Sequence, residues 1–272
     1  MAQLETLSGV GFIGCGNMGS ALLRQFTQHP PEGAAAQFFV YDADVALADD
    51  CAAACGITRC ASAAELVQKS TLVVAAVKPQ QLHGVLTPLR DALRDKVLVS
   101  IAAGITLDAL RSLAPGARVI RVMPNTPAQL GAGVSAWTAA ENVLPDDKKA
   151  FTMLFSASGL LFPLEEKLMN AFTALAGSGP AYAFMLINAL AEGGVREGLN
   201  KKDALVMTAQ TFLGSARMVL ELGEHPEVLK DRVTSPGGTT AAGLAALETD
   251  AVRSACIKAV AAARARAEEL GK

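Results

Sequence analysis

The segment TSPGGTT, from Thr234 to Thr240, gathers hydroxyl side chains and two adjacent glycines just before an alanine-rich stretch. This pattern predicts a helix N-terminus at which Pro236 stiffens the entry and Gly237 and Gly238 leave backbone N–H groups open to a ligand. The N–H groups, the positive end of the helix dipole and the hydroxyls together suit a small anion such as a carboxylate. The alternative is an ordinary Ser- or Thr-capped helix, although a simple cap does not require two glycines.

A second group of residues near the start of the chain could bind phosphate. Gly14, Gly16 and Gly19 have the G-x-G-x-x-G spacing, after an apolar run from Val10 to Ile13 and before a helical pattern. In a strand–turn–helix of this kind the first glycine permits the tight turn. The second lets the backbone approach a pyrophosphate, and the third lets helix and strand pack closely. The pattern predicts a dinucleotide site on the helix N-terminus.

Asp42 ends the next apolar run, QFFVYD (37–42), about where an acidic residue binds the ribose 2′-hydroxyl in NAD sites. It would repel a 2′-phosphate, and no Lys or Arg follows before Arg59. This local argument favours NADH over NADPH. The alternative is that Asp42 merely caps a helix that begins near Val45.

The elements that must position these residues alternate between strand and helix in the first half of the chain. Apolar runs predict strands at 10–13, 37–42, 71–77, 96–104, 117–127, 131–140 and 160–165, and helices at 80–94 and 106–114. Such alternation predicts a parallel sheet covered on both faces, with ligands beyond the carboxyl ends of the strands. The segments expected there are Gly14–Met18, Val77–Pro79, Ala102–Gly104 and Met123–Thr126.

After Glu165 the pattern is all helical. GSGP (177–180) should break one helix and start another, which is apolar on every side from Ala181 to Ile187. A helix of this kind must bury its surface, and a second subunit is the natural partner. We therefore expect two domains, 1–165 and 166–272, and at least a homodimer.

Composition excludes other classes of protein. The 272 residues are 51% hydrophobic with a formal charge of −2, which does not suggest a nucleic-acid partner. The longest apolar runs, such as 72–77 and 181–191, are too short to span a bilayer, and the N-terminus lacks the features of a signal peptide. We expect no membrane segment and a cytoplasmic location. The five cysteines lack the spacing of a metal site, so no metal is expected.

The polar residues also restrict the reaction. Each of the three histidines stands near Pro or Gly on an expected surface, and none forms the His–Asp pair typical of hydroxyacid dehydrogenases. Reduction of a ketone normally requires a strong proton donor, whereas a protonated imine loses its charge as it accepts hydride. A dinucleotide site combined with a carboxylate cradle therefore suggests reduction of a small imino acid.

The sequence resembles the pyrroline-5-carboxylate reductase family over nearly its whole length. The motifs that carry the resemblance are GFIGCGNMGSAL, AVKPQQ, SIAAGIT, RVMPNTPAQLGAGVSAW, ALAGSGPAYAF and TSPGGTTAAGLAALE, in the family's order. It implies an α/β Rossmann-type dinucleotide-binding domain plus an all-α C-terminal dimerisation domain. It also implies interlocked dimers that often form decamers, and reduction of L-1-pyrroline-5-carboxylate to L-proline by NADPH or NADH.

The resemblance also implies roles for particular residues. The cofactor would be held by Ile13, Gly14, Cys15, Gly16, Asn17, Met18, Gly19, Asp42, Val77, Lys78, Pro79, Ala102, Ala103 and Asn125, with Asn125 near the nicotinamide. The substrate would be bound by Glu166, Ser235, Gly238, Thr239 and Thr240. Thr240 is the expected partner of the imine nitrogen. Lys78 would reach the cofactor or add positive field, the alternative being a solvated lysine.

Two positions depart from the family pattern. Many members carry polar or basic residues suited to NADPH after the second strand, where this chain has Tyr41-Asp42-Ala43-Asp44. Ala63 stands where some relatives place an asparagine that contacts the cofactor. Both departures concern the choice of cofactor. The remaining hypotheses are reduction of another cyclic imine or a β-hydroxyacid, and a dinucleotide-sensing scaffold without turnover.

Overall fold

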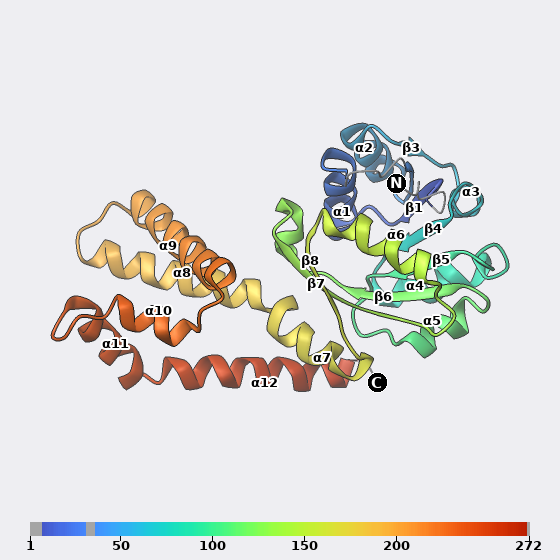
Figure 1. Ribbon diagram of the computed structural model, residues 1–272. Helices are drawn as coiled ribbons and strands as arrows, with labels where there is room; N and C mark the ends of the chain where they lie inside the picture. Colours follow the sequence, from blue (N-terminus) through green and yellow to red (C-terminus); the bar gives the residue numbers. More distant parts are fainter. Residues whose placement is uncertain (1–6, 31–35, 271–272) are drawn as a thin grey trace. The chain divides into compact units, whose positions relative to one another are not determined.

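A computed structural model describes residues 7–30 and 36–270 of the chain (Figure 1). The chain divides into two compact units. The first runs to Gly177 and is joined by the chain from Arg264 onward, and the second comprises Ser178–Ala263.

The first unit contains an eight-stranded sheet with the order β3-β2-β1-β4-β5-β6-β7-β8. Its strands are β1 (Gly9–Ile13), β2 (Gln37–Tyr41), β3 (Thr58–Arg59), β4 (Leu72–Ala75), β5 (Val97–Ser100), β6 (Arg118–Met123), β7 (Gly133–Ala139) and β8 (Gly159–Pro163). The chain leaves β1 for β2 and β3 on one side and then crosses to β4 on the other. The order in which strands are added therefore reverses between β1 and β4. Open α/β sheets bind ligands at such a switch point, beyond the carboxyl ends of the strands.

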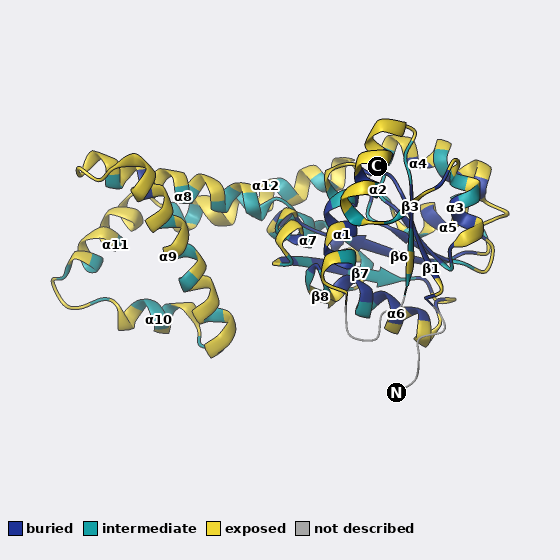
Figure 2. Ribbon diagram, turned by 90° about the horizontal axis from the view of Figure 1, so that it is seen from above, coloured by how far each residue is buried: buried dark blue, intermediate teal, exposed yellow. Residues whose placement is uncertain are grey.

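Six α-helices connect these strands and cover both faces of the sheet (Figure 1). They are α1 (Asn17–Gln28), α2 (Val45–Cys55), α3 (Ala63–Lys69), α4 (Pro79–Leu86), α5 (Leu107–Leu113) and α6 (Pro145–Ser156), with 3-10 turns at Thr87–Leu89 and Thr126–Leu130. Strands β1, β4 and β5 are wholly buried, as a parallel sheet between two helical layers requires (Figure 2).

A chain of aromatic rings fixes α1 against the sheet. Phe12 of β1 contacts Phe26 of α1 with ring centroids 5.9 Å apart, and Phe26 contacts Phe155 of α6 at 5.0 Å. Phe155 then meets Phe151 at 4.6 Å, and Phe151 meets Trp137 of β7 at 5.2 Å. Edge and tilted arrangements at these distances are favourable for aromatic pairs. Helix α1, whose first turn contains the last glycine of the motif, is thereby held against the sheet.

The predicted strands are present, but the sheet is not entirely parallel. Strand β7 pairs antiparallel with β6, while β8 is parallel to β7. The segment between Met123 and Gly133 is too short for a helical crossover, which needs about a dozen residues or more. The chain therefore turns back through the 3-10 helix Thr126–Leu130 and enters β7 in the opposite direction.

Several elements were not anticipated, and the expected helix at 80–94 is shorter. Helix α4 ends at Leu86 and is followed by a 3-10 turn. Helix α3 follows a capping pattern that is visible in the sequence, a serine at position 62 with a glutamate three residues later. In the structure the Ser62 hydroxyl accepts from Glu65 N at 3.1 Å and the Glu65 carboxylate accepts from Ala61 N at 2.7 Å. Helix α6 begins at Pro145, a preferred first position. Strand β3 has only two residues and left no pattern to read.

The helix start expected at GSGP is confirmed, because α8 begins at Gly179 with Ser178 as its N-cap and Pro180 in its first turn, and the segment before it changes its helical winding. A 3-10 turn (Glu166–Leu168) is followed by α7 (Met169–Phe172), a π-helical turn (Thr173–Gly177) and α8 (Gly179–Arg196). Taken as one helical stretch, Glu166–Arg196 spans 31 residues with a mean hydropathy of 1.3, long and apolar enough to cross a membrane by length and composition alone. Uninterrupted apolar runs do not indicate this length, because Gly177, Ser178 and Gly179 interrupt the stretch.

The second unit is helical, as predicted. Its elements are α8, α9 (Lys201–Leu222), α10 (Pro226–Arg232), α11 (Thr239–Thr249) and most of α12 (Val252–Leu270). Among Ser178–Ala263, Ala191 and Ala204 are the only hydrophobic residues that are buried. Large apolar side chains stand exposed, including Phe184, Met185, Val206, Leu213, Leu220 and Ile257. The ribbon of α8 and α9 is accordingly coloured mostly as exposed (Figure 2). This unit does not bury its apolar surface within one chain.

Candidate active site

The glycine motif forms a tight turn where three strands end. Gly14 N donates to the Tyr41 carbonyl at 2.9 Å, and Ala76 N donates to the Ile13 carbonyl at 2.8 Å. The ends of β2, β1 and β4 therefore meet at this loop. Helix α1 begins immediately afterwards with Gly16 as its N-cap and no capping side chain. Its first N–H groups are thus presented as an anion site beyond the sheet's carboxyl edge.

The three glycines serve different purposes. Gly14 has φ +106°, and a Cβ there would lie 2.6 Å from the Ala76 carbonyl oxygen. A Cβ at Gly19 would lie 2.4 Å from the Gly14 carbonyl oxygen, so α1 could not approach the strand as closely. At Gly16 nothing lies within 4 Å of that position, and the residue is exposed. Gly14 and Gly19 are therefore required by the fold, whereas Gly16 leaves room for a ligand.

Asp42 is bound to the glycine loop itself. Its Oδ2 accepts from Cys15 N at 2.7 Å, and its Oδ1 accepts from Asp44 N at 3.0 Å. Asp44, and not Asp42, caps α2, because its Oδ1 accepts from Ala46 N and Leu47 N at 3.1 and 3.2 Å. The alternative interpretation of Asp42 as a helix cap was therefore wrong.

The other predicted cofactor segments also follow strands of the sheet. After β4, Val77 lies against the glycine turn, with its Cγ1 3.0 Å from where a Gly14 Cβ would stand. Lys78 is exposed and precedes Pro79, the first residue of α4. After β5, Ala102 is buried and Ala103 is exposed. These segments share the carboxyl edge with the loop, as the sheet topology requires.

The side-chain amide of Asn125, which was expected near the nicotinamide, is hydrogen-bonded to the backbone of two neighbouring segments. The residue is 8% exposed, its Nδ2 donates to the Ala176 carbonyl at 3.1 Å, and its Oδ1 accepts from Val134 N at 2.9 Å. The side chain therefore links the end of β6 to β7 and to the π-helical turn. It positions the backbone of its loop rather than presenting a free amide.

Glu166, expected to bind substrate, joins two elements of the first unit. Its Oε1 accepts from Leu107 N, at the start of α5, and from Nη1 of the buried Arg121, each at 2.7 Å. A cavity of about 350 Å³ lies beside this pair, lined also by Gly104, Thr106, Lys167, Asn170 and Glu268. Arg121 was not predicted from sequence, because an arginine within an apolar strand carries no motif.

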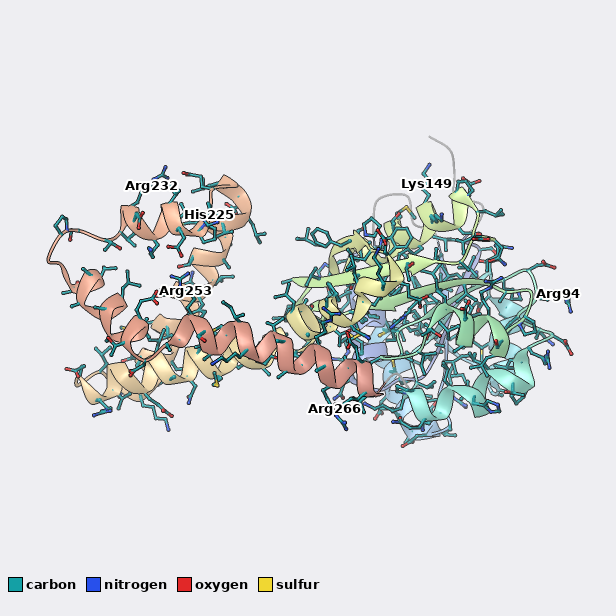
Figure 3. The ribbon with its side chains drawn as sticks, turned by 90° about the horizontal axis from the view of Figure 1, so that it is seen from below. Arg94, Lys149, His225, Arg232, Arg253 and Arg266 are labelled. Atoms are coloured by element: carbon teal, nitrogen blue, oxygen red, sulfur yellow. The ribbon has the colours of Figure 1, made fainter. Side chains whose placement is uncertain are left out.

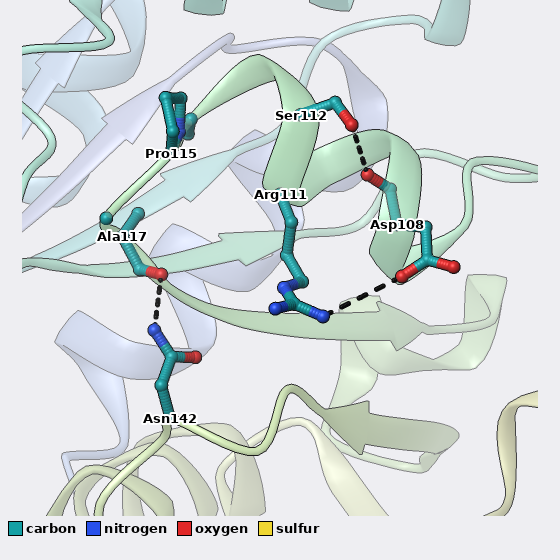
Figure 4. Close-up of a pocket in the computed structure, with 8 residues that line it drawn as sticks. Asp108, Arg111, Ser112, Pro115, Ala117 and Asn142 are labelled. Atoms are coloured by element: carbon teal, nitrogen blue, oxygen red, sulfur yellow. Dashed lines mark hydrogen bonds and ion pairs between the residues drawn. The ribbon is translucent and has the colours of Figure 1, made fainter.

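A larger hollow, of about 440 Å³, lies at the opposite edge of the sheet (Figure 4). It is formed where α5 leads into β6, and Arg111 contacts Asp108 there at 3.8 Å. Asn142 Nδ2 donates to the Ala117 carbonyl at 3.0 Å. Ala117 precedes the amino end of β6, so this hollow is remote from the edge at which α/β sheets bind ligands.

In the second unit, TSPGGTT forms a turn followed directly by α11. Gly238 N donates to the Ser235 carbonyl at 3.0 Å across Pro236 and Gly237, and Gly237 has φ +68°. Proline followed by a left-handed glycine is the signature of a type II turn. The predicted helix N-terminus is therefore present.

The start of α11 is not an ordinary hydroxyl cap. Gly238 is its N-cap and no side chain caps it. The first intrahelical bond runs from Ala242 N to the Gly238 carbonyl at 3.2 Å, so the amides of Thr239, Thr240 and Ala241 precede it. Within residues 7–30 and 36–270, the Ser235, Thr239 and Thr240 hydroxyls have no hydrogen-bond partner. Free N–H and O–H donors thus gather at the positive end of a helix dipole.

Salt bridges hold this turn between α10 and α12. Arg253 contacts Glu227 of α10 at 3.1 Å and Glu248 near the end of α11 at 2.9 Å, and Arg232 contacts Glu224 at 2.6 Å (Figure 3). These contacts hold the pKa of Glu227 below its usual range, chiefly through hydrogen bonds from Lys230 and Arg253. Arg253 therefore links α10, which precedes the turn, to the end of α11, which follows it.

The thiol within the glycine motif, Cys15, is unreactive in character, whereas its hydrogen bond with Cys51 lowers the pKa of Cys51 to about 7. All five are free thiols, and Cys15 and Cys51 are buried. The hydrogen bond with Cys51, followed by burial, raises the pKa of the Cys15 thiol far above its usual range. Burial also raises the pKa of Cys55 and Cys60. A thiol that stays protonated is a poor nucleophile, so the cysteine within the glycine motif serves in packing and not in chemistry.

A glycine-rich turn at the switch point of a doubly wound sheet, with a separate helical unit, defines the class of dinucleotide-dependent oxidoreductases. Residues 9–104 match the family described as NADP oxidoreductase coenzyme F420-dependent, and residues 166–270 match pyrroline-5-carboxylate reductase dimerisation.

Relatives of known name match almost the whole chain. The pyrroline-5-carboxylate reductases of Methanosarcina acetivorans and Escherichia coli are 42% and 40% identical, each over 97% of this chain and 98% of the relative. The Coxiella burnetii pyrroline-5-carboxylate reductase structure has a TM-score of 0.91 at 34% identity, covering 98% of this chain and 99% of that one. The chain belongs to the pyrroline-5-carboxylate reductase family. The resemblance and the fold class predicted from the sequence are confirmed.

Proposed function

We propose that this protein reduces L-1-pyrroline-5-carboxylate to L-proline by hydride transfer from NADPH or NADH, the last step of proline biosynthesis. The observation that carries the proposal is the uncapped N-terminus of α11, where free amides and the hydroxyls of Ser235, Thr239 and Thr240 gather behind a Gly-Gly turn. This donor set suits an amino-acid carboxylate. The names of relatives 40–42% identical over nearly the full length support the same reaction.

The residues present fit a dinucleotide. The exposed Gly16 and the first turn of α1 would hold the pyrophosphate, and Val77 to Pro79 with Ala102 and Ala103 would line the cofactor. The Plasmodium falciparum pyrroline carboxylate reductase structure, 31% identical with a TM-score of 0.85, was solved with NADP bound. When bound, the reduced nicotinamide supplies a hydride to the ring carbon of the C=N bond.

The chain's own residues then act by positioning and electrostatics. The amides at the start of α11 clamp the carboxylate, and the Thr240 hydroxyl orients the ring nitrogen. The exposed Lys78 adds positive charge beside the cofactor segment. Because a protonated imine is neutralised by hydride, no strong acid is needed at the reacting carbon. Glu166 and Asn125 support the substrate and nicotinamide regions by holding α5 and the loop after β6.

We further propose a cytoplasmic homodimer built on the second unit, able to assemble into larger oligomers such as decamers. The exposed apolar side chains of α8 and α9 would be covered by a second copy, which accounts for their hydropathy without a membrane. The family match over residues 166–270 supports this surface as the dimer interface.

The reaction is tested by following oxidation of NADH and NADPH by purified protein with pyrroline-5-carboxylate. We expect turnover that yields L-proline, and little or none with 2-ketoacids or with 3-oxoacids, the oxidised partners of β-hydroxyacids. Other cyclic imines serve as the comparison for substrate size. Absence of turnover with pyrroline-5-carboxylate, in a protein that still binds the dinucleotide, would contradict the proposal and favour a sensing role.

A further inference from the structure

The cofactor site contains a carboxylate whose position is set by the backbone. Both oxygens of Asp42 accept backbone hydrogen bonds, one from Cys15 N at 2.7 Å and one from Asp44 N at 3.0 Å. Cys15 lies between the first two glycines of the phosphate-binding turn. Rotation of Asp42 away from the loop would break both bonds, so the negative charge stays beside the expected ribose of the cofactor.

A fixed carboxylate at this place recognises hydroxyl groups. A carboxylate offers about four acceptor positions, and the two backbone donors leave capacity for more. At the end of the second strand, such an acidic residue accepts from the ribose 2′-hydroxyl. NADPH carries a phosphate there with a charge of about −1.5 to −2 at pH 7 and no hydroxyl to donate.

The surrounding charges do not offset this repulsion. Asp44, at the start of α2, adds a second exposed carboxylate, and no Lys or Arg lies between Asp42 and Arg59. Arg59 is engaged by Asp49, with Nε 2.5 Å from Oδ1. Arg24 stands seven residues into α1, about 10 Å along the helix axis from its N-terminus. Residues 1–6 and 31–35 contain neither Lys nor Arg.

We propose that Asp42 makes this enzyme selective for NADH over NADPH. The inference rests on the proposed reductase function and specifies its cofactor. Binding should discriminate because NADH gains a hydrogen bond at Asp42, whereas NADPH places its phosphate against two carboxylates. Like-charge juxtaposition is an effective way to reject a competing ligand.

The test is direct titration of the full-length protein with NADH and NADPH by calorimetry, without substrate. We expect NADH to bind the wild type at least about tenfold more tightly than NADPH, as like-charge juxtaposition predicts. Asp42→Asn keeps the size of the side chain and removes its charge, and should bring the ratio of the two dissociation constants close to one. Thermal melting establishes that the variant is folded.

Asp44→Asn is the matched control, because asparagine is an equally good helix cap and removes one charge two residues away. It should change the ratio much less than Asp42→Asn does. Equal or tighter NADPH binding by the wild type overturns the inference, as does an equal shift in both variants. Binding and turnover are separate readouts, so protein that prefers NADH but does not reduce pyrroline-5-carboxylate contradicts only the proposed reaction.

Discussion

The helices of the first unit each bury side chains against the sheet, as Leu22 and Leu23 do in α1, whereas α8 to α11 leave residues of similar size in solvent. A sheet offers two broad apolar faces, so six helices can be stabilised within one chain. Four or five helices without a sheet have no comparable surface. The difference indicates that the first unit has a hydrophobic core of its own, whereas the apolar side chains of the second need a partner surface to be buried.

The largest effect should come from placing a charge on the exposed helices. Leu213 in α9 is 55% exposed and Leu144 before α6 is 53% exposed. Because a charge buried in an apolar interface is costly, Leu213→Glu should raise the dimer dissociation constant by at least ~100-fold, measured by sedimentation. Leu144→Glu should leave assembly unchanged. If both variants remain dimers of wild-type affinity, the exposed helices are not the interface.

Within the first unit, two glycine substitutions should separate folding from binding. Gly14→Ala places a Cβ at φ +106° and 2.6 Å from a carbonyl oxygen, so it should lower the free energy of unfolding by ~3 kcal/mol. Gly16→Ala meets no atom within 4 Å and should cost under ~1 kcal/mol while weakening NADH binding ~10-fold. Melting curves and titrations measure the two effects. If both variants lost the same free energy of unfolding, the close contact between Gly14 and the Ala76 carbonyl would not be what distinguishes the two glycines.

In the second unit, Thr240→Ala should lower kcat/KM by ~10–100-fold, the usual scale for one lost positioning contact. Thr249→Ala, at the other end of α11, removes a hydroxyl that donates to the Ala245 carbonyl of the same helix and is the control. Steady-state kinetics with both substrates varied will distinguish them. A Thr240→Ala enzyme with full activity would remove this hydroxyl from the mechanism.

The smallest effects on stability should come from removing ion pairs, which are more buried in the first unit than in the second. Asp147 is 4% exposed and bonds to Arg118 and to Leu144 N, so Asp147→Asn should cost ~1–2 kcal/mol. Glu227 lies on the surface of the second unit, and Glu227→Gln should not measurably change the melting temperature, because exposed pairs contribute little. A larger loss for Glu227→Gln than for Asp147→Asn would reverse this comparison.

The sequence predicted those parts of the fold that depend on neighbouring residues. The glycine turn, the strand before it and the helix start after TSPGG are local patterns, and each is present. The direction of β7 was not predictable in this way, since it depends on where the preceding connection allows the chain to go.

The site was predicted less completely for the same reason. Asn125 and Glu166 were identified through resemblance, but their contacts with Ala176 and Arg121 join segments about 45 to 51 residues apart. Asp42 was identified from its spacing, whereas its bond to Cys15 N requires the two strand ends to meet. Sequence spacing indicates which side chains are present at an edge, and only the packing of the sheet determines which of their atoms are already engaged.

The order of elements along the chain has a consequence for biosynthesis. The last strand, β8, ends at Pro163, so the cofactor sheet can be complete before the helices of the second unit, from Gly179 onward, have been translated. The helices with exposed apolar side chains then emerge attached to a first unit that has already folded. The apolar surface of the second unit is consequently open to non-specific association only until the chain meets a second copy. Neighbouring ribosomes on one messenger RNA would shorten that interval.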